Sequence, residues 1–210
     1  LADVLRGKKI KKLDLRECRL TPQNAAKIIK DLGKLEILKL NGNDLHQNVE
    51  DLANALSDKK IKELDLVSCQ LTSQDAAKII KDLGKLEILK LVGNVLHQNV
   101  EDLADVLRGK KIKELDLGDC RLTPQNAAKI IEKADVKTII LSANSFNEID
   151  PIIQALKNSD CKIEECKLSD NNQYQRAQDA IKERISNQQK TILDNIDIDA
   201  IFEPVSDISL

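Results

Sequence analysis

The sequence contains two histidines, His46 and His97, and these are the first residues to consider for metal or general-base chemistry. They hold equivalent positions 51 residues apart in a chain that repeats with that period. If each period contains two strands of one sheet, the two backbones lie about 10 Å apart. Two histidines that share a zinc ion need ring nitrogens about 2.1 Å from the metal. We therefore expect both histidines to be structural or surface residues, without a shared metal site.

The five cysteines are the candidates for nucleophilic or redox chemistry. Cys18, Cys69 and Cys120 recur at one position of the repeat, so we expect them in the core, about 10 Å apart and beyond disulfide reach. We expect Cys166 to point inward and Cys161 to be exposed. A catalytic cysteine needs a nearby base, and no histidine is close to any of them in sequence or repeat geometry. The odd cysteine count, without a secretion signal, predicts reduced thiols and a cytoplasmic protein.

Other chemical motifs are missing from the sequence. It has no glycine-rich phosphate loop, no H-E-x-x-H segment and no calcium loop, so we expect no enzymatic activity, no cofactor and no metal. The net charge of −2 and the aromatic content of 1% argue against nucleic-acid binding, because base stacking needs aromatic side chains. No run approaches 18 apolar residues, so we expect no membrane-spanning helix and no membrane partner.

Lysine pairs recur before alternate strands of the predicted fold, at Lys8-Lys9, Lys59-Lys60 and Lys110-Lys111. They predict a basic stripe along one edge. Two interpretations remain open. The stripe could contact phosphate or an acidic partner. Alternatively, its lysines complement the negative ends of the preceding helices.

A repeat of about 25 residues determines the fold. Segments 10–20 and 35–45 both follow the pattern L-x-x-L-x-L-x-x-[N/C]-x-L, and the same frame begins again at Ile61, Leu86, Ile112, Val136 and Ile163. Leu13 and Leu15 are two residues apart, so both point to one side of a strand, and Asp14 points to the other. Each repeat therefore predicts a short strand with an aliphatic inner face.

The second half of each repeat predicts a helix. Thr21 is a suitable N-cap, Pro22 suits the first helical position, and Gly33 follows as a stop. The residues between them place an apolar stripe at helical spacing, formed by Ala25, Ala26, Ile28, Ile29 and Leu32. In the alternate repeat we expect Asn48 to cap the helix. A single unit cannot bury its apolar face alone, so stacked repeats must supply the core.

The alternating Cys and Asn repeats resemble the ribonuclease-inhibitor-like branch of the leucine-rich-repeat family. The resemblance covers residues 1–173. It implies an α/β horseshoe of about seven repeats, with a parallel sheet on the concave face and helices on the convex face. The abundant Lys, Ile and Asn, without any Trp, add a resemblance to leucine-rich-repeat effectors of intracellular bacteria. This implies export into a host cell. Some such effectors are ubiquitin ligases whose catalytic cysteine lies in a separate domain.

Residues 174–210 predict a capping helix and an acidic tail. The apolar positions that suggest a lid over the end of the core are Tyr174, Ala177, Ile181, Ile185 and Ile192. Residues 191–210 contain five acids and no Lys or Arg, and 196–202 alternate with a period of two. We expect this tail to form a strand, pack on the cap or reach a second chain. Repeats six and seven are degenerate, as capping units are.

Comparison of the chain with itself indicates where a partner binds. Residues 1–29 and 103–131 differ at three positions only, Lys12/Glu114, Arg16/Gly118 and Glu17/Asp119. All three pairs lie on the outward side of the predicted strand segment, whereas the exposed helix positions are unchanged. Drift after a recent duplication does not explain this restriction. We therefore expect the concave face to bind a partner.

Equivalent outward residues stack as columns across the predicted sheet. The central column runs Asp14, Lys39, Asp65, Lys90, Asp116, Ile140 and Lys167, and we expect its charges to form cross-strand pairs with a structural role. Ile37, Ile88, Val67 and Val92 in the flanking columns predict a small apolar centre with a charged rim. The candidate partner-binding residues are Lys12, Arg16, Ile37, Asn41, Glu63, Val67, Ile88, Val92, Glu114 and Gly118.

The sequence thus predicts a non-enzymatic protein-binding module, monomeric or weakly self-associating, that engages a protein partner. Two alternatives remain. The chain could recruit substrate for an enzyme, such as an effector ubiquitin ligase, whose catalytic domain lies in sequence not included here. It could also be a structural element that self-associates through its N-terminal end or its tail. The chain has no Met and opens on a segment found mid-repeat elsewhere, so we expect a fragment or processed form.

Overall fold

The computed structural model describes residues 2–158 and 160–194, and this part of the chain alternates seven strands with eight helices. The strands are β1 (Lys12–Asp14), β2 (Ile37–Lys39), β3 (Glu63–Asp65), β4 (Ile88–Lys90), β5 (Ile112–Asp116), β6 (Val136–Ile140) and β7 (Glu165–Lys167). The helices are α1 (Ala2–Leu5), α2 (Pro22–Ile29), α3 (Glu50–Leu56), α4 (Ser73–Lys81), α5 (Val100–Leu107), α6 (Pro124–Lys133), α7 (Asp150–Lys157) and α8 (Asn171–Asp194).

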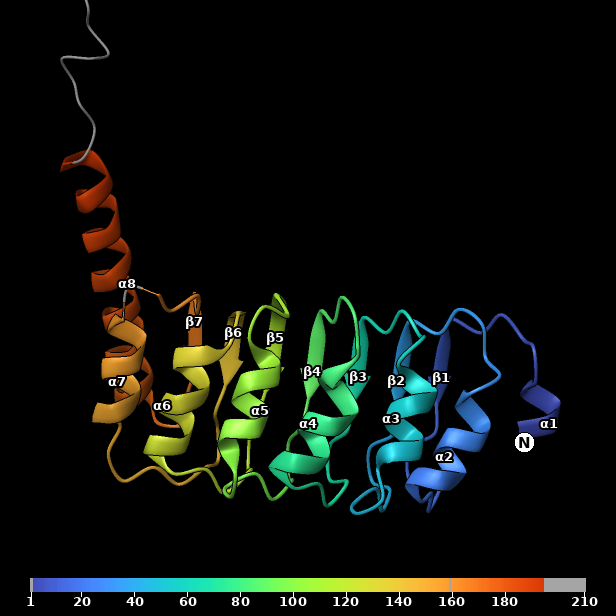
Figure 1. Cartoon of the computed structure of the whole chain (residues 1–210). Coiled ribbons are helices and arrows are strands. Elements are labelled where there is room, and N and C mark those ends of the chain that lie inside the picture. The colour runs from blue at the N-terminus through green and yellow to red at the C-terminus, as the bar shows by residue number, and fades with distance from the viewer. Residues whose placement is uncertain (1, 159, 195–210) are drawn as a thin grey trace, which may run out of the picture.

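All seven strands form one parallel sheet in sequence order, β1 to β7. Helices α2 to α7 lie side by side along one face of this sheet, and each packs against the next (Figure 1). The α/β class and the parallel sheet are therefore as predicted, in a solenoid-like arrangement of repeated units. We call the sheet face that these helices do not cover the open face.

The alternation of side chains explains how such short strands are held. In β2, β3 and β4 the central leucine is fully buried and its two neighbours are half-buried. The following leucine of each repeat, such as Leu40 or Leu66, is fully buried as well. Burying a leucine stabilises the fold by about 1.5–3 kcal/mol, so three to five ladder residues per strand suffice once the repeats stack.

In alternate repeats a buried asparagine ties the repeat to the preceding one at the turn after the strand. Asn94 Nδ2 donates to Leu66 O at 2.9 Å and to Leu91 O at 2.7 Å. Its Oδ1 accepts from Cys69 N at 3.1 Å and Leu71 N at 2.9 Å. Asn43 and Asn144 hold the corresponding positions, so the Asn half of the sequence pattern satisfies backbone groups that stacking removes from water.

Helix caps follow the sequence in alternate repeats only. Thr21 and Thr123 accept a hydrogen bond from the backbone three residues on, and Thr72 forms a reciprocal capping box with Asp75. The expectation for Asn48 was wrong. Val49 is the N-cap of α3 without a side-chain hydrogen bond, because Asn48 adopts a left-handed conformation (φ 50°) that ends the preceding loop.

The long helix α8 closes the C-terminal end of the sheet, as predicted. Ala177 and Ile181 are buried and Tyr174 is half-buried against the core. Ile185, expected on the same face, is instead exposed, because the second half of α8 extends beyond the last repeat (Figure 1). The side chain of Ile192 and the predicted strand of 196–202 lie outside the described part of the chain.

The buried residue in this part of α8 is Arg184. Its guanidinium donates to Leu156 O at 3.0 Å and to Ile163 O at 2.5 Å, so it caps the C-terminus of α7 and ties the helix to β7. Its aliphatic stem covers apolar neighbours at the same time. A hydrophobicity pattern cannot identify such a position, because it scores arginine as surface.

Candidate functional site

The candidate binding site is the open face of the sheet, formed by the outward side chains of the seven strands. The sheet register aligns these side chains in columns as the sequence predicts. The first column joins Lys12 to Ile37, Ile37 to Glu63, Glu63 to Ile88 and Ile88 to Glu114. Lys12 is exposed, whereas the other members of this column are half-buried.

A second column begins where each strand enters its turn. Main-chain hydrogen bonds keep it in register: Glu17 N donates to Asn41 O, Gly42 N to Val67 O, Ser68 N to Val92 O and Gly93 N to Gly118 O. Val67 and Val92 therefore lie on adjacent chain segments, and both are half-buried. Asn41 is half-buried too, and its Oδ1 is shielded from solvent without a hydrogen-bond partner. Arg16 is exposed.

Gly118 is the candidate that differs most from its neighbours, because it is buried. A Cβ at this position would lie 3.3 Å from Asp116 Oδ1, 3.3 Å from Ser142 O and 3.7 Å from Val92 Cγ1. The glycine therefore lets the β5 turn approach the next repeat closely. Its contribution to the open face is a local recess beside Val92 and not a side chain that contacts a partner.

The charged central column lies between these two columns. Its register is as expected, with Asp14 beside Lys39 and Asp65 beside Lys90. The expected cross-strand ion pairs are absent, however: no ion pair in the described part of the chain joins two members of this column. Each aspartate instead accepts a hydrogen bond from the backbone two residues on, as Asp65 does from Val67 N at 3.2 Å. A local turn competes successfully with the long lysine side chains.

Two aspartates at matching positions of this column have pKa values shifted in opposite directions. The hydrogen bonds and charge of Arg16 lower the pKa of Asp14, and the guanidinium lies 2.8 Å from its carboxylate. Burial raises the pKa of Asp116, with a further contribution from the charge of Glu114. Gly118 supplies no cation there, although its backbone N–H does donate to Asp116 at 3.0 Å. The open face thus changes in charge along the sheet.

The cysteines are arranged largely as predicted, with two corrections. Cys69, Cys120 and Cys166 are buried, and burial raises their pKa values to about 12. Cys18 was expected in the core but is exposed, because β1 is the edge strand of the described sheet and pairs with β2 alone. Cys161 was expected to be exposed but is buried, because Arg184 of α8 packs beside it. None of the five forms a disulfide.

The two histidines have different surroundings. His46 Nδ1 lies 2.5 Å from Asp44 Oδ1, whereas His97 has Val95 in place of that aspartate, and its own Nδ1 is shielded without a partner. Within residues 2–158 and 160–194, no group of three or more His, Cys, Asp or Glu side chains is arranged to hold a metal ion. No helix in that part is long and apolar enough to cross a membrane.

For two of the lysine pairs, Lys59-Lys60 and Lys110-Lys111, the structure shows that the first lysine bonds the end of a helix. Lys59 Nζ donates to Lys30 O at 2.9 Å, just after α2, and only 5% of the residue is exposed. Lys110 Nζ donates to Lys81 O at 2.7 Å and to Leu83 O at 2.6 Å, at the end of α4. These two lysines cap the preceding helices. Their neighbours Lys60 and Lys111 are exposed.

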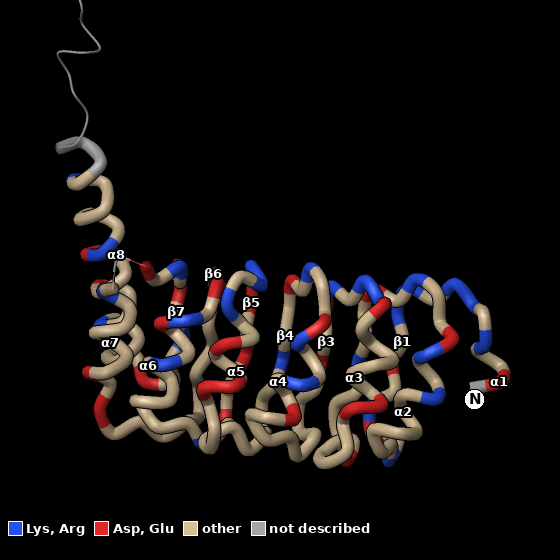
Figure 2. Tube along the Cα trace, in the orientation of Figure 1, with Lys and Arg blue, Asp and Glu red and all other residues tan. Residues whose placement is uncertain are grey.

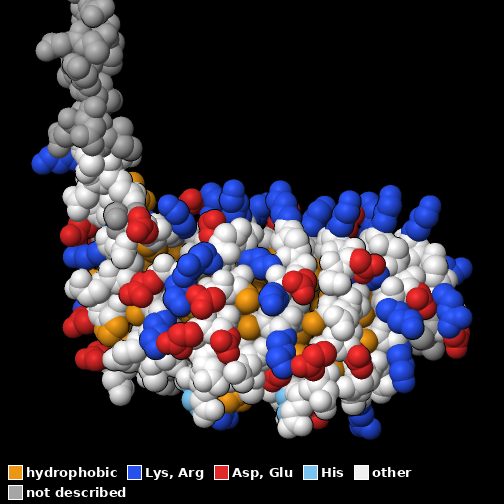
Figure 3. Space-filling model, viewed as in Figure 1, with side chains coloured by type: hydrophobic (Ala, Val, Ile, Leu, Met, Phe, Trp, Pro, Cys, Tyr) orange, Lys and Arg blue, Asp and Glu red, His pale blue; other side chains and the backbone are white. Residues whose placement is uncertain are grey.

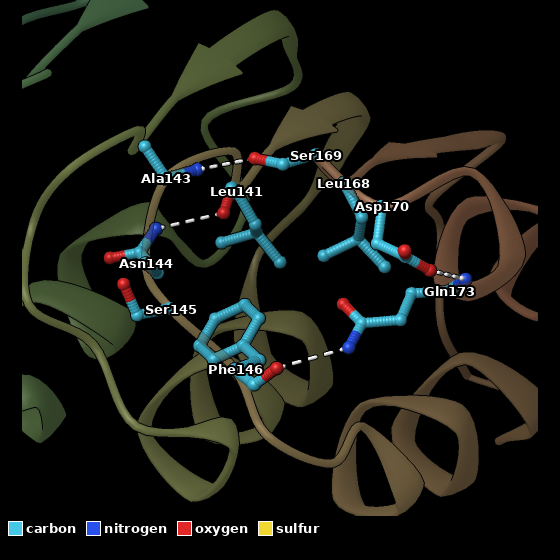
Figure 4. A pocket seen from close by; sticks show the side chains of 9 residues that line it. All are labelled: Leu141, Ala143, Asn144, Ser145, Phe146, Leu168, Ser169, Asp170 and Gln173. Carbon is cyan, nitrogen blue, oxygen red and sulfur yellow. Dashed lines mark hydrogen bonds between the residues drawn. The ribbon is translucent and has the colours of Figure 1, made fainter.

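One pocket that the sequence analysis missed lies where β6 and β7 end beside α8 (Figure 4). It has a volume of about 370 Å³ and is lined by Leu141, Ala143, Asn144, Ser145, Phe146, Leu168, Ser169, Asp170 and Gln173. Its polar groups largely bond one another: Ala143 N donates to Ser169 Oγ at 2.7 Å, and Gln173 Nε2 donates to Phe146 O at 3.0 Å. No cysteine or histidine lines it.

No protein-family model and no curated protein sequence matches this chain.

Proposed function

We propose that this chain is a leucine-rich-repeat protein that binds a protein partner through the open face of its sheet, without enzymatic activity of its own. One observation carries the proposal. Two near-identical segments within the chain, 1–29 and 103–131, differ at three positions. Lys12/Glu114 and Arg16/Gly118 belong to the two columns of the open face, and Glu17/Asp119 lies in the turn directly after the second column. The helices between them, α2 and α6, have the same residues over their shared length.

The leucine-rich-repeat assignment is supported by the physical role of each pattern position. The leucines of the pattern are buried under the sheet, and Asn43, Asn94 and Asn144 each bond the main chain of two neighbouring repeats. Cys69 and Cys120 take the alternative position of the pattern, where the thiol donates to a carbonyl of the preceding repeat at 3.3 and 3.1 Å. Extended sheet faces of such solenoids are suited to large partners.

The chemistry of the open face suits a folded protein better than a small molecule. Ile37 and Ile88 lie on one side of the charged central column, and Val67 and Val92 on the other. A partner that buries these half-exposed aliphatic groups gains about 25 cal/mol per Å² of apolar surface, and the charged column between them fixes its orientation. The resemblance to effectors of intracellular bacteria extends the proposal to a partner from a host cell.

Affinity capture tests the proposal, with this chain as bait in a host-cell lysate and mass spectrometry as the readout. Val67→Lys/Val92→Lys adds two charges to the open face, and Gln74→Lys/Gln125→Lys adds two charges at exposed positions on the helical side. The expected result is a partner that binds the unaltered chain and the helical-side variant but not the open-face variant. Circular dichroism confirms that both variants fold.

Three other outcomes would replace the proposal. A partner that binds all three proteins equally would move the site off the open face. A captured ubiquitin-pathway enzyme or its substrate would favour the substrate-recruiting alternative. No captured protein, together with a molecular mass that rises with concentration, would favour a self-associating structural element.

A further inference from the structure

A row of lysines lies along the edge of the molecule at which the strands begin. Its members precede the first five strands by one to three residues, and we call them the lysine edge: Lys9, Lys34, Lys60, Lys85 and Lys111. All five are exposed. Figure 3 shows Lys and Arg side chains projecting side by side along this edge. The sixth repeat has Asp135 at the same position, which ends the row.

The sheet holds the lysine edge in register. Two residues after each lysine the main chains of neighbouring repeats are bonded: Glu36 N donates to Lys11 O, Lys62 N to Glu36 O, Glu87 N to Lys62 O and Lys113 N to Glu87 O. Successive members of the row therefore follow the strand spacing of about 4.8 Å. Four such intervals give a straight row about 19 Å long.

These five lysines differ from most others in the chain, which are paired. Lys62 lies 2.7 Å from Glu36, Lys78 2.7 Å from Glu50, and Lys133 2.8 Å from Asp105, in each case an acid one repeat earlier. No side-chain hydrogen bond or ion pair in the described part of the chain involves a member of the lysine edge. Acids are not scarce, because the chain has 35 of them against 33 Lys and Arg. Glu36 and Glu87 act on Lys34 and Lys85 through their charges, but the row has no direct ion pair although the sequence could supply one.

At two helix ends the structural role open to these lysines is filled by other lysines. The helices end at the same edge of the sheet, and their C-terminal carbonyls attract cations. Lys59 and Lys110 supply those cations by direct hydrogen bonds to the ends of α2 and α4. Like charges on adjacent strands destabilise a sheet, so the additional row costs stability and returns no hydrogen bond or ion pair within the described part of the chain.

We propose that the lysine edge binds an extended acidic polypeptide segment. An extended chain of about six residues spans the 19 Å row. Such a segment carries at most about six carboxylates, a number close to the five ammonium groups of the row. A DNA duplex would present about eleven phosphates over the same length, and the row contains no aromatic side chain for stacking on single-stranded bases. Lysine is also a point charge that suits carboxylates without demanding a fixed geometry.

The shape of the molecule argues against the other common polyanion, a flat anionic membrane. Helix α8 extends past the same edge at the C-terminal end of the sheet (Figures 1 and 2). A planar surface would meet this helix before it reached the lysines, whereas a single extended chain can lie alongside the row. This site is distinct from the open face, and the proposal holds whether or not the open face binds a partner.

The test uses the full chain and a fluorescein-labelled peptide of about eight glutamates, followed by fluorescence anisotropy at low and physiological salt. The edge variant carries Lys34→Gln, Lys60→Gln, Lys85→Gln and Lys111→Gln. The control carries Lys27→Gln, Lys81→Gln, Lys129→Gln and Lys182→Gln, which removes the same charge from exposed positions on the helices. We expect the edge variant to lose roughly tenfold or more in affinity and the control less than about threefold, with weaker binding of the unaltered chain at higher salt.

Four results would overturn the proposal. The unaltered chain could fail to bind the peptide, or the edge variant and the control could lose affinity equally, which would show a net-charge effect only. A single-stranded oligonucleotide of the same length could bind more tightly than the peptide, which would identify a phosphate-backbone site. Vesicles containing phosphatidylserine could retain the unaltered chain but not the edge variant, which would identify a membrane site.

Discussion

Residues 1–29 and 103–131 are almost the same sequence in two places of one molecule, and their structures differ. The first copy forms a three-residue strand, β1, whereas the second forms the five-residue strand β5. β1 pairs with β2 alone, but β5 pairs with β4 on one side and with β6 on the other, where Ile112 meets Val136. Residues 61–65 match 112–116, and β3 has a strand on both sides but is also three residues long, so the extra pair in β5 depends on its partner β6.

The thiols of the two copies show the same dependence on neighbours. Cys120 is fully buried and its Sγ donates to Leu91 O of the preceding repeat at 3.1 Å. Cys18 follows the edge strand of the described sheet, and its Sγ donates to Arg16 O of its own turn, at 3.3 Å. Position in the stack, and not local sequence, therefore decides whether this cysteine belongs to the core.

The aspartates of the two copies differ for two reasons. Asp14 and Asp116 stand at the same position, but Arg16 gives a cation to the first, and Gly118 gives none to the second. Arg16 lowers the pKa of Asp14, whereas burial raises the pKa of Asp116. The comparison teaches that stacking sets core properties, whereas burial and a substituted residue together set the electrostatics of the open face.

The largest expected effect concerns the reactivity of the thiols. At about pH 8, iodoacetamide should modify Cys18 at least roughly a hundredfold faster than Cys120, because a buried thiol reacts only after local opening and burial raises its pKa to about 12. Peptide mass spectrometry after timed quenching measures both rates. In urea the five cysteines should react at similar rates, and comparable rates for Cys18 and Cys120 in the native protein would contradict the burial difference.

The asparagines that join each copy to the next repeat provide the second test. Asn144 Oδ1 accepts from both Cys120 N and Leu122 N, whereas Asn43 Oδ1 accepts from Leu20 N alone. Asn144→Ala therefore leaves one more buried backbone donor unpaired. We expect Asn144→Ala to lower the free energy of unfolding by about 3 kcal/mol and Asn43→Ala by about 2 kcal/mol. Urea unfolding followed by circular dichroism measures both, and a larger loss for Asn43→Ala would reverse the ranking.

Most of the fold could be predicted from the sequence because it depends on a pattern that every repeat restates. The positions of Leu13 and Leu38 in their strands, and the caps at Thr21 and Thr123, depend on nearby residues only. The columns of the open face followed from strand spacing alone. The repeat pattern determines which residues of neighbouring strands stand side by side, and this register was predicted for every strand.

The errors lie at the two ends of the described sheet, where the repeat pattern does not determine which neighbours cover a residue. Cys18 follows the edge strand β1, and Ile185 lies in the part of α8 that extends beyond the last repeat. Cys161 is buried by Arg184, a residue that no periodicity marks as part of the core. The absent ion pairs of the central column have another cause: the local turn of each aspartate decides where its carboxylate points, and a column of charges does not reveal it.

The third prediction concerns the pH dependence of stability. Asp116 has a folded-state pKa above its ordinary value of 3.8, so its charged form costs stability at neutral pH, and the cost disappears as the pH falls through that raised pKa. Asp116→Asn keeps an oxygen for the Gly118 N–H. It should raise the free energy of unfolding near pH 7 by a few tenths of a kcal/mol after solvent screening, with a smaller gain at acid pH.

Asp14→Asn is the matched comparison and should act with the opposite sign. The pKa of Asp14 is lowered, so its charged form contributes stability above the ordinary pKa, and this contribution is lost as the pH falls through the folded-state value. The neutral amide of this variant removes that contribution at neutral pH. Urea unfolding from about pH 3 to pH 7 measures both variants, and effects of equal sign at neutral pH would show that Arg16 and Gly118 do not distinguish the two sites.

The smallest expected effect comes from making the first copy resemble the second. Arg16→Gly removes the guanidinium from Asp14 but preserves the backbone N–H that also donates to it. The pKa of Asp14 should therefore rise toward 3.8, and the loss of stability should not exceed that of Asp14→Asn, because the backbone hydrogen bond remains. Titration of the Asp14 carboxyl carbon by NMR measures the shift, and an unchanged pKa would mean that the backbone hydrogen bond alone lowers it.

The reverse exchange, Gly118→Arg, is not equivalent, because its Cβ would lie 3.3 Å from Ser142 O and would disturb the turn that positions Asp116. The exchange of these two residues is therefore informative in the direction Arg16→Gly.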